Sequence, residues 1–244
     1  MDRTESRLEH AVADGVATVV ISNPAKRNAM TAAMWGALPG LLERLAADAA
    51  VRVLVLTGAG DTFCAGADIS SLRDPAVDPQ ALAVFPRPTL AAIRGYCVGG
   101  GSQLAAACDL RFAEEGASFG VTPARLGIVY AASSTRRLVA LTGPATAKHL
   151  LFSGELIDTA RALRTGLVDE VLPPGELGKR VDAYARTLAA RSRLTQAAAK
   201  EFATGREDRD AYWAEQERRS GDTAEGVAAF LERRAPRFTW PKGL

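Results

Sequence analysis

The sequence is poor in the residues that build metal centres and disulfide frameworks. Its 244 residues include only two histidines, His10 and His149, and three cysteines. The cysteines, Cys64, Cys97 and Cys108, are odd in number and form no CxxC pair. A disulfide framework and a His/Cys zinc site are therefore both disfavoured, and we expect chemistry without a bound metal.

An excess of one charge and a long hydrophobic run are also missing. Lys and Arg number 30 against 28 Asp and Glu, so nucleic acid and anionic membrane surfaces are not expected as partners. The polar start, MDRTESRLEH, lacks the apolar core of a signal peptide. No apolar run approaches the ~20 residues that a transmembrane helix needs. These absences predict a cytoplasmic protein.

What the chain does contain is typical of a globular α/β protein. Hydrophobic residues make up 48% and charged residues 24%, which argues against disorder. The apolar patterns predict strands over 8–12, 16–21, 51–57, 89–93, 110–113 and 168–171, and helices over 32–47, 134–141, 144–152 and 159–164. From about residue 176 the pattern is almost wholly helical. We expect an α/β core over 1–175, followed by a helical region over 176–244 that packs subunits together.

Two Gly-rich segments follow predicted strands, a placement typical of ligand sites in α/β proteins. In the run Gly99-Gly100-Gly101, the missing Cβ atoms let a ligand approach the backbone. The helix that follows presents free N–H groups, which would stabilise the developing oxyanion of an acyl carbonyl. The alternative interpretation is a tight turn needed only for helix–strand packing. The run matches neither the GxGxxG nor the GxxxxGK[ST] nucleotide fingerprint.

Several motifs, in order and spacing, resemble the crotonase (enoyl-CoA hydratase/isomerase) superfamily. They are NPAKRNAM, FCAGADI, GYCVGGGSQLAAACDLRFA, the FG at 119–120, LLFSGELIDTARALRTGLVDEVLP and FLERRAPRF. The resemblance covers the chain from about residue 8 to 238. The resemblance implies a crotonase-like spiral of ββα units with two roughly perpendicular sheets. It also implies C-terminal helices that build a homotrimer or a hexamer (a dimer of trimers). The implied substrate is an acyl-CoA thioester, with coenzyme A as part of the substrate and no separate cofactor.

The resemblance also implies roles for particular residues. By motif position, the backbone N–H groups of Ala67 and Gly100 form an oxyanion hole that holds a thioester enolate. Candidate coenzyme A contacts are Lys26, Arg27, Ala29, Ala65, Asp68 and Ile69 in the two loops, with Phe230 and Arg233 at the nucleotide end, sometimes of a neighbouring subunit. The alternative for Lys26, Arg27 and Arg233 is an ordinary solvated charge.

The sequence departs from the family where hydratases carry two catalytic Glu residues. Those positions hold Gln103 and Pro123. Gln cannot accept a proton at neutral pH, and Pro has no polar side-chain atom. Because hydration uses acid–base assistance twice, a two-carboxylate hydratase is disfavoured.

The run FGVTPARLGIVY resembles the methylmalonyl-CoA decarboxylase branch, in which a Tyr faces the substrate carboxylate. Tyr130 falls at that position. Loss of CO₂ needs no base, and Gln103 and Tyr130 can donate hydrogen bonds to the departing carboxylate. Pro123 and Arg125 are further candidate substrate contacts. A decarboxylase-like enzyme is therefore our first expectation.

Two alternatives stay open. One is a 2-enoyl-CoA hydratase or enoyl-CoA isomerase that uses a non-standard acid/base, such as Tyr130 or a water held by Gln103. The other is a non-catalytic acyl-CoA binding protein, although such a protein has no need of an oxyanion hole. The structural alternative for Tyr130 is a core aromatic residue, and for Gln103 it is an amide that faces the cavity without a role. The short segment 70–88 predicts a reduced lid and a more open acyl pocket.

Overall fold

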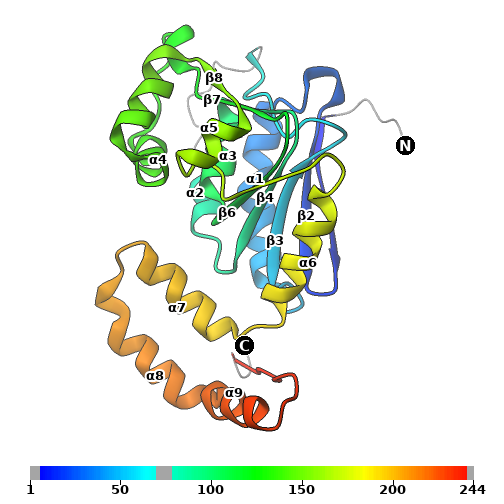
Figure 1. Ribbon diagram of the computed structural model, residues 1–244, viewed down its shortest axis with the longest axis vertical. Coiled ribbons are helices and arrows are strands. Elements are labelled where there is room, and N and C mark those ends of the chain that lie inside the picture. Colours follow the sequence, from blue (N-terminus) through cyan, green and yellow to red (C-terminus); the bar gives the residue numbers. More distant parts are fainter. Residues whose placement is uncertain (1–5, 70–78, 241–244) are drawn as a thin grey trace.

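A computed structural model describes residues 6–69 and 79–240 of the chain (Figure 1). Its main sheet has six strands in the order β1-β2-β3-β4-β6-β9, and every neighbouring pair is parallel except β1 and β2. The strands are β1 (Arg7–Ala13), β2 (Val16–Ser22), β3 (Val53–Gly58), β4 (Thr89–Ile93), β6 (Leu110–Glu114) and β9 (Glu170–Leu172). The α/β fold expected from the sequence is confirmed.

The β1–β2 hairpin closes through Asp14 and Gly15, as the sequence predicts. Both residues have positive φ angles, 50° and 80°, which a two-residue hairpin turn of this hand requires. Helix α1 (Ala32–Ala47) also has the predicted bounds, and the Thr31 hydroxyl caps it by accepting a hydrogen bond from Met34 N at 3.3 Å.

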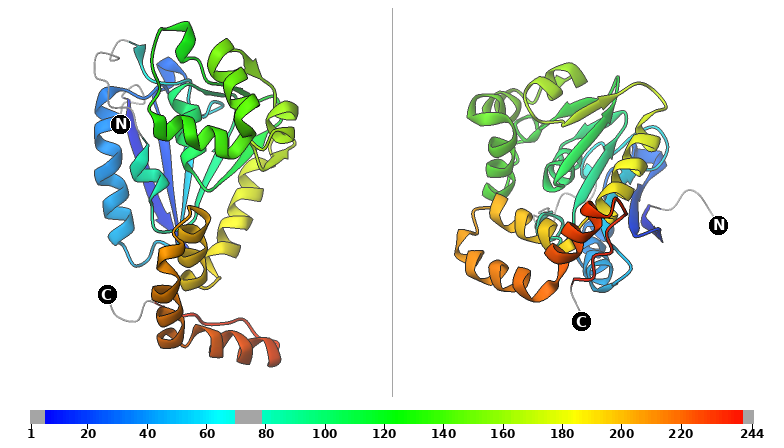
Figure 2. Two further views of the ribbon diagram at one scale, coloured as in Figure 1. Left: turned by 90° about the vertical axis from the view of Figure 1, so that its left-hand side faces the viewer. Right: turned by 60° about the horizontal axis from the view of Figure 1, so that its bottom comes forward.

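Helices cover both faces of the main sheet (Figures 1 and 2). Alternate residues of β3 enter two separate cores: Leu54 packs with α1, while Val53 packs with α6 (Leu177–Ala189). Buried on both faces, β3 reads as a continuous apolar run. Helix α6 falls within the expected C-terminal region 176–244, yet its buried residues belong to the core. The chain leaves the core only after α6.

A second, three-stranded sheet lies beside the first and consists of β5 (Tyr96–Val98), β7 (Ser118–Gly120) and β8 (Leu156–Ile157). These strands were not predicted, because two or three residues are too short to show a period. Helix α3 (Gly100–Ala107) follows β5 directly, and all eight of its residues are buried. The predicted helices 134–141 and 144–152 form the two halves of α4 (Ala132–Ser153), which bends at Gly143 where φ is 74°.

The remaining elements connect the layers or extend from them. They are the short helices η1 (Pro24–Lys26), α2 (Gln80–Ala83), η3 (Pro123–Arg125), α5 (Thr159–Arg164) and η4 (Glu207–Arg209), and the longer α7 (Arg193–Ala203), α8 (Asp210–Ser220) and α9 (Asp222–Leu231). Helices α7 to α9 stand away from the core (Figures 1 and 2). Most of the expected reduced lid, 70–78, lies outside the described residues. Within those residues, no helix combines the length and apolar character needed to cross a membrane.

The packing of α6 gives a first prediction. Val181 is 2% exposed and lies against the sheet. Its replacement by Ala removes two buried methyl groups and leaves a cavity, so the free energy of unfolding should fall by about 2 kcal/mol. Val129, which is 93% exposed, provides the matched control, and Val129→Ala should change it by less than about 0.5 kcal/mol. Urea unfolding measures both. Equal effects would show that α6 is not part of the core.

Candidate active site

Two loops lie side by side at the carboxyl edge of the main sheet, where ligand sites of parallel sheets are found. One follows β2 and the other follows β3. Backbone hydrogen bonds join them: Ala65 N donates to Arg27 O at 3.0 Å, Met30 N to Gly66 O at 2.8 Å, and Asp68 N to Met30 O at 2.8 Å. The structure therefore brings together the two segments that the sequence assigns to coenzyme A.

Asn28 holds the first loop in an unusual conformation. Its φ of 59° is left-handed, and its side chain is buried. The Asn28 amide donates to Ala59 O at 2.8 Å and Thr62 O at 2.6 Å, while its Oδ1 accepts from Asn23 N at 3.0 Å. Sequence reasoning missed this role. The only signal was an Asn, a residue type that tolerates left-handed backbone.

The Gly-rich run places two amide groups next to each other. Gly99 has a φ of 56° and turns the chain from β5 into α3. A Cβ atom on Gly100 would lie 3.2 Å from Ala67 N and 3.0 Å from Cζ2 of Trp35. In the part of the chain that the structure describes, neither the Ala67 N–H nor the Gly100 N–H donates a hydrogen bond. Two free backbone donors this close together are what the predicted oxyanion hole requires.

The packing interpretation of the Gly run also holds, for a different residue. A Cβ on Gly101 would overlap the carbonyl oxygen of Cys64. That carbonyl accepts a hydrogen bond from Val98 N at 3.0 Å, which fixes the loop against β5. Gly101 thus permits close packing, whereas Gly100 keeps the space beside Ala67 N free.

Burial disfavours Cys64 as a nucleophile despite its place in this loop. Burial raises the pKa of its thiol to about 11, and hydrogen bonds from the backbone offset only part of that effect. At neutral pH the group is therefore a thiol rather than a reactive thiolate. Its Sγ donates to Gly66 O at 3.4 Å, which supports the loop.

Tyr130 and Gln103 come together beside the Gly-rich run. The Tyr130 hydroxyl oxygen lies 3.7 Å from where a Cβ on Gly99 would be. Burial raises the pKa of Tyr130, although a hydrogen bond with the Gln103 side chain acts in the opposite direction. The Ser134 hydroxyl donates to Gln103 Oε1 at 3.4 Å, so one amide side chain contacts both Ser134 and Tyr130. Two neutral hydrogen-bonding groups therefore adjoin the amide pair.

A small apolar pocket continues beyond these two side chains, between α3 and α4. Its lining consists of Ser102, Gln103, Ala106, Val121, Tyr130, Ser134, Thr135, Leu138 and Leu151. None of these residues is Asp or Glu. Pro123 is buried at the start of η3 and adds no polar atom.

Six of the residues expected to contact coenzyme A lie on the two paired loops. Lys26 Nζ forms an ion pair with Asp68 Oδ2 at 2.7 Å, and the Arg27 guanidinium lies 5.0 Å from the ring centroid of Tyr96. These groups, with buried Ala29, belong to the paired loops. So do Ala65 and Ile69, and the Ile69 side chain is 68% exposed.

Three expected contacts do not join the centre within one chain. Arg125 is exposed, packs against Gly154, and does not line the pocket of Gln103 and Tyr130. Phe230, 82% exposed, belongs to α9, and Arg233 follows it. Figure 1 shows α9 at the opposite end of the molecule from α3 and β7.

Trp35 is a site residue that sequence reasoning missed. It projects from α1 to within 3.0 Å of the Cβ position of Gly100, and its indole nitrogen is buried without a hydrogen-bond partner among the described residues. Nothing in its spacing along α1 distinguishes it from a core aromatic.

The sheet topology, the paired loops and the adjacent free amide groups define an α/β protein with a candidate ligand site at the carboxyl edge of its main sheet. The family model for enoyl-CoA hydratase/isomerase matches residues 11–241, and the chain belongs to this family. It is therefore an acyl-CoA enzyme of the crotonase superfamily, as the motifs predicted.

Relatives and solved structures agree with this assignment over nearly the whole chain. The chain is 34% identical to the (E)-benzylidenesuccinyl-CoA hydratase of Thauera aromatica, covering 93% of this chain and 96% of the relative. It is 35% identical to the 2,3-dehydroadipyl-CoA hydratase of Escherichia coli, covering 91% and 94%. A crystal structure of an enoyl-CoA hydratase/isomerase family member matches with a TM-score of 0.92 and 39% identity, covering 98% of both chains. The resemblance of 119–130 to the decarboxylase branch stays a prediction.

The amide pair gives a second prediction. The Cβ of Gly100→Ala would lie between Trp35 and Ala67 N and block the oxyanion position. Loss of this stabilisation should lower kcat by about 10²- to 10³-fold. Gly36→Ala, on α1 with open space at its Cβ, is the matched control and should keep full activity. Steady-state assays with circular dichroism measure activity and folding. Full activity of folded Gly100→Ala would refute the assignment.

Proposed function

We propose that the protein is an enoyl-CoA hydratase that adds water to a 2-enoyl-CoA thioester without the usual pair of carboxylates. The observation that carries this proposal is the position of the Tyr130 hydroxyl beside Gly99, next to the amide groups of Ala67 and Gly100. A thioester oxygen held by the two amides would bring the reacting carbons toward a neutral proton donor. The hydratase names of the relatives support the same reaction.

The proposed reaction balances with a single water and one tyrosine. The water oxygen forms a bond to C3, and the electron pair of the C2–C3 double bond moves to give an enolate on the thioester oxygen. The amide groups of Ala67 and Gly100 stabilise that oxygen. Tyr130 donates its proton to C2 and recovers one from the attacking water, so the phenol is unchanged at the end. Gln103 orients the phenol.

A second candidate is the decarboxylation of a malonyl-type thioester. The specific observation in its favour is the absence of Asp and Glu from the pocket lined by Gln103 and Tyr130. A carboxylate on the substrate meets no like charge among those lining residues, and both polar side chains can hold it. Cleavage of the carbon–carbon bond releases CO₂ and leaves its electron pair in the same enolate.

Binding of coenzyme A and assembly of subunits complete the proposal. The paired loops, with Lys26 and Arg27 at their surface, are suited to the phosphates of coenzyme A. Phe230 and Leu231 expose apolar surface on α9, which stands away from its own core. We propose that this surface contacts a neighbouring subunit of a homotrimer or hexamer and brings Arg233 toward that subunit's coenzyme A.

Tyr130→Phe tests the proton donor. Crotonyl-CoA hydration should fall by about 10²-fold or more, because general acid catalysis is lost while the ring remains. Tyr184→Phe, on the opposite face of the sheet, should keep full activity. The raised pKa of Tyr130 keeps the phenol protonated, so the rate that depends on Tyr130 should stay constant to about pH 9 and fall only above pH 10, the ordinary value.

Assays of the wild-type protein with three acyl-CoA substrates decide between the two candidate reactions. Wild-type protein that decarboxylates methylmalonyl-CoA but leaves crotonyl-CoA and a 3-enoyl-CoA unchanged would replace the hydratase proposal with the second candidate. Tight binding of coenzyme A without any turnover would refute both and favour a binding protein.

Gln103→Glu provides an opposite test of the two reactions. A carboxylate at this position supplies a base for water, so the hydratase proposal expects faster crotonyl-CoA hydration, by about tenfold or more. The same carboxylate repels a substrate carboxylate, so a decarboxylase should become slower. Gln103→Met, of similar volume without a charge, controls for packing. Slower hydration in Gln103→Glu than in Gln103→Met would contradict the proposed role.

A further inference from the structure

A second cavity lies at the opposite edge of the main sheet from the amide pair. Arg52 precedes β3 and Arg87 precedes β4, so both belong to the amino ends of parallel strands. Helix α7 forms the facing wall, and Figure 1 shows it beyond that end of the sheet. The cavity has a volume of about 430 Å³, within the range of small-molecule sites.

The lining of this cavity is strongly cationic. Its positive residues are Arg52, Arg87, Arg193, Lys200 and Arg206, whereas Glu201 is its single acidic residue. Glu201 Oε2 already accepts hydrogen bonds from Arg209 Nε at 3.1 Å and Trp213 Nε1 at 2.8 Å. Lys200 is paired with Asp109 at 2.8 Å, and Arg206 with Asp208 at 2.9 Å. Three arginines are left without a carboxylate partner in the described part of the chain.

These three arginines keep hydrogen-bonding capacity. Arg87, only 8% exposed, donates to Ala46 O at 2.7 Å and Asp48 O at 3.2 Å, and Arg52 donates to Arg191 O at 3.2 Å. The Nε atoms of Arg52 and Arg87 are buried and have no partner among the described residues. Within the same residues, the Arg193 side chain forms no hydrogen bond or ion pair. Buried donors in this state cost free energy. A ligand in the cavity would bind the terminal N–H groups of the arginines, because the two Nε atoms are enclosed.

Repulsion among the three positively charged arginines adds to the free-energy cost of burying them. The pKa of Arg87 is lowered to about 10, chiefly by burial and then by the nearby charges of Arg193 and Arg52. Burial and Arg193 likewise lower the pKa of Arg52. The opposing carboxylates are Asp48 and Asp222, and neither lines the cavity.

Those two carboxylates are engaged elsewhere. Asp222 accepts from Ser192 Oγ at 2.7 Å and from Thr239 N at 3.3 Å, and Asp48 Oδ1 accepts from Ala50 N at 2.8 Å. An anion inside the cavity would meet a net positive field, which the charges of Asp48 and Asp222 reduce.

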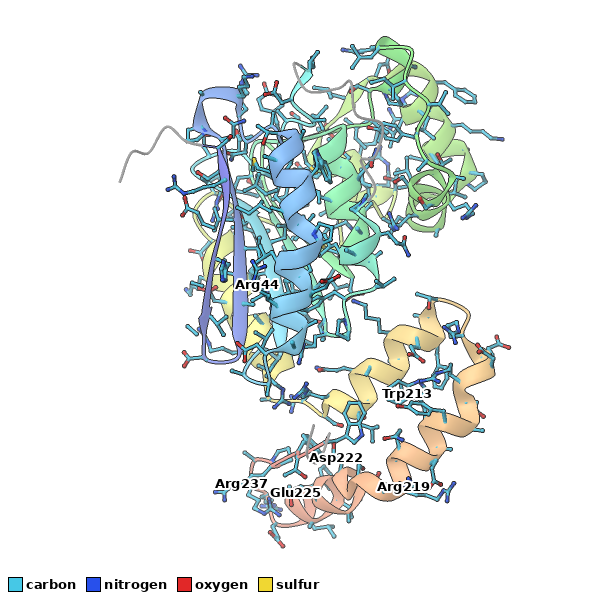
Figure 3. The ribbon with its side chains drawn as sticks, turned by 180° about the vertical axis from the view of Figure 1, so that it is seen from behind. Arg44, Trp213, Arg219, Asp222, Glu225 and Arg237 are labelled. Carbon is cyan, nitrogen blue, oxygen red and sulfur yellow. The ribbon has the colours of Figure 1, made fainter. Side chains whose placement is uncertain are left out.

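Aromatic walls adjoin the arginines. Trp213 and Trp240 both line the cavity, with ring centroids 5.8 Å apart, and Figure 3 shows Trp213 between α7 and α8. The apolar residues Val84, Phe85, Pro86 and Pro88 complete this side of the cavity. A ligand with a phosphate group and a flat ring matches both parts of the lining, because arginines bind phosphate and indoles stack on rings.

We propose that this cavity is a binding site for a small phosphorylated ligand, with its phosphate held by Arg52, Arg87 and Arg193. The site is separate from the oxyanion hole and does not depend on which reaction the protein catalyses. The shared chemistry is a diphosphate, which an inorganic ion or a nucleotide would each supply.

The experiment is isothermal titration of the full chain with pyrophosphate and with ADP at constant ionic strength. Saturable binding is expected for wild-type protein and for Arg191→Gln, whose exposed side chain does not line the cavity. Arg193→Gln should weaken binding at least tenfold. Without ligand, its melting temperature should equal or exceed that of wild type, because repulsion is relieved. Tighter binding of ADP indicates a nucleotide, and equal binding indicates a simple diphosphate.

Other results would overturn the proposal. Undiminished binding in Arg193→Gln, together with lost binding in Lys26→Ala, would place the phosphate at the coenzyme A loops instead. No saturable binding in wild-type protein would exclude the site. A different outcome is a change of oligomeric state in Arg193→Gln, together with a failure of pyrophosphate to compete with subunit association. These two results together would show that a carboxylate of a second copy fills the cavity.

Discussion

The close approach of two backbone segments controls the catalytic end of this molecule. Gly66-Ala67 and Gly99-Gly100 come so near to one another that a single methyl group on Gly100 would approach Ala67 N to 3.2 Å. Three backbone hydrogen bonds to the 23–30 loop hold the first segment, and the turn from β5 into α3 holds the second. Because the donors are backbone groups, they stay in place whatever side chains surround them. The proposed oxyanion hole therefore does not depend on the side chains at the two positions held by Gln103 and Pro123.

In the proposed reaction, the acid–base chemistry depends on neutral groups. Ser134 orients Gln103, Gln103 contacts Tyr130, and burial raises the pKa of the phenol so that it keeps its proton. A protonated phenol can donate to a carbon or to a carboxylate, which is why one arrangement suits both hydration and decarboxylation. The enolate is common to the two reactions, and only the group that leaves or adds differs.

Opposite edges of the main sheet have opposite character. The carboxyl edge has Gly-rich loops and free amide groups, whereas the amino edge, closed by α7, has three arginines and two tryptophans. Helix α6 packs across the sheet between these edges, and the chain leaves the core only after it. Both the cationic cavity and the exposed apolar surface of α9 thus arise from the way in which the C-terminal helices stand away from the core (Figure 2).

The sequence by itself determined the longer elements and the two Gly-rich loops. Regular elements such as α1 and the β1–β2 hairpin were predictable because local signals, a Thr cap and an Asp-Gly turn, act within a few residues. Motif order predicted roles for Ala67 and Gly100, and only the folded chain brings these two residues together. Only the tertiary structure decided the rest, because long-range contacts leave no periodic signal. It assigned α6 to the core, placed Trp35 beside Gly100, separated Arg125 from the pocket of Tyr130, and gathered Arg52, Arg87 and Arg193, which are distant in the chain, around one cavity.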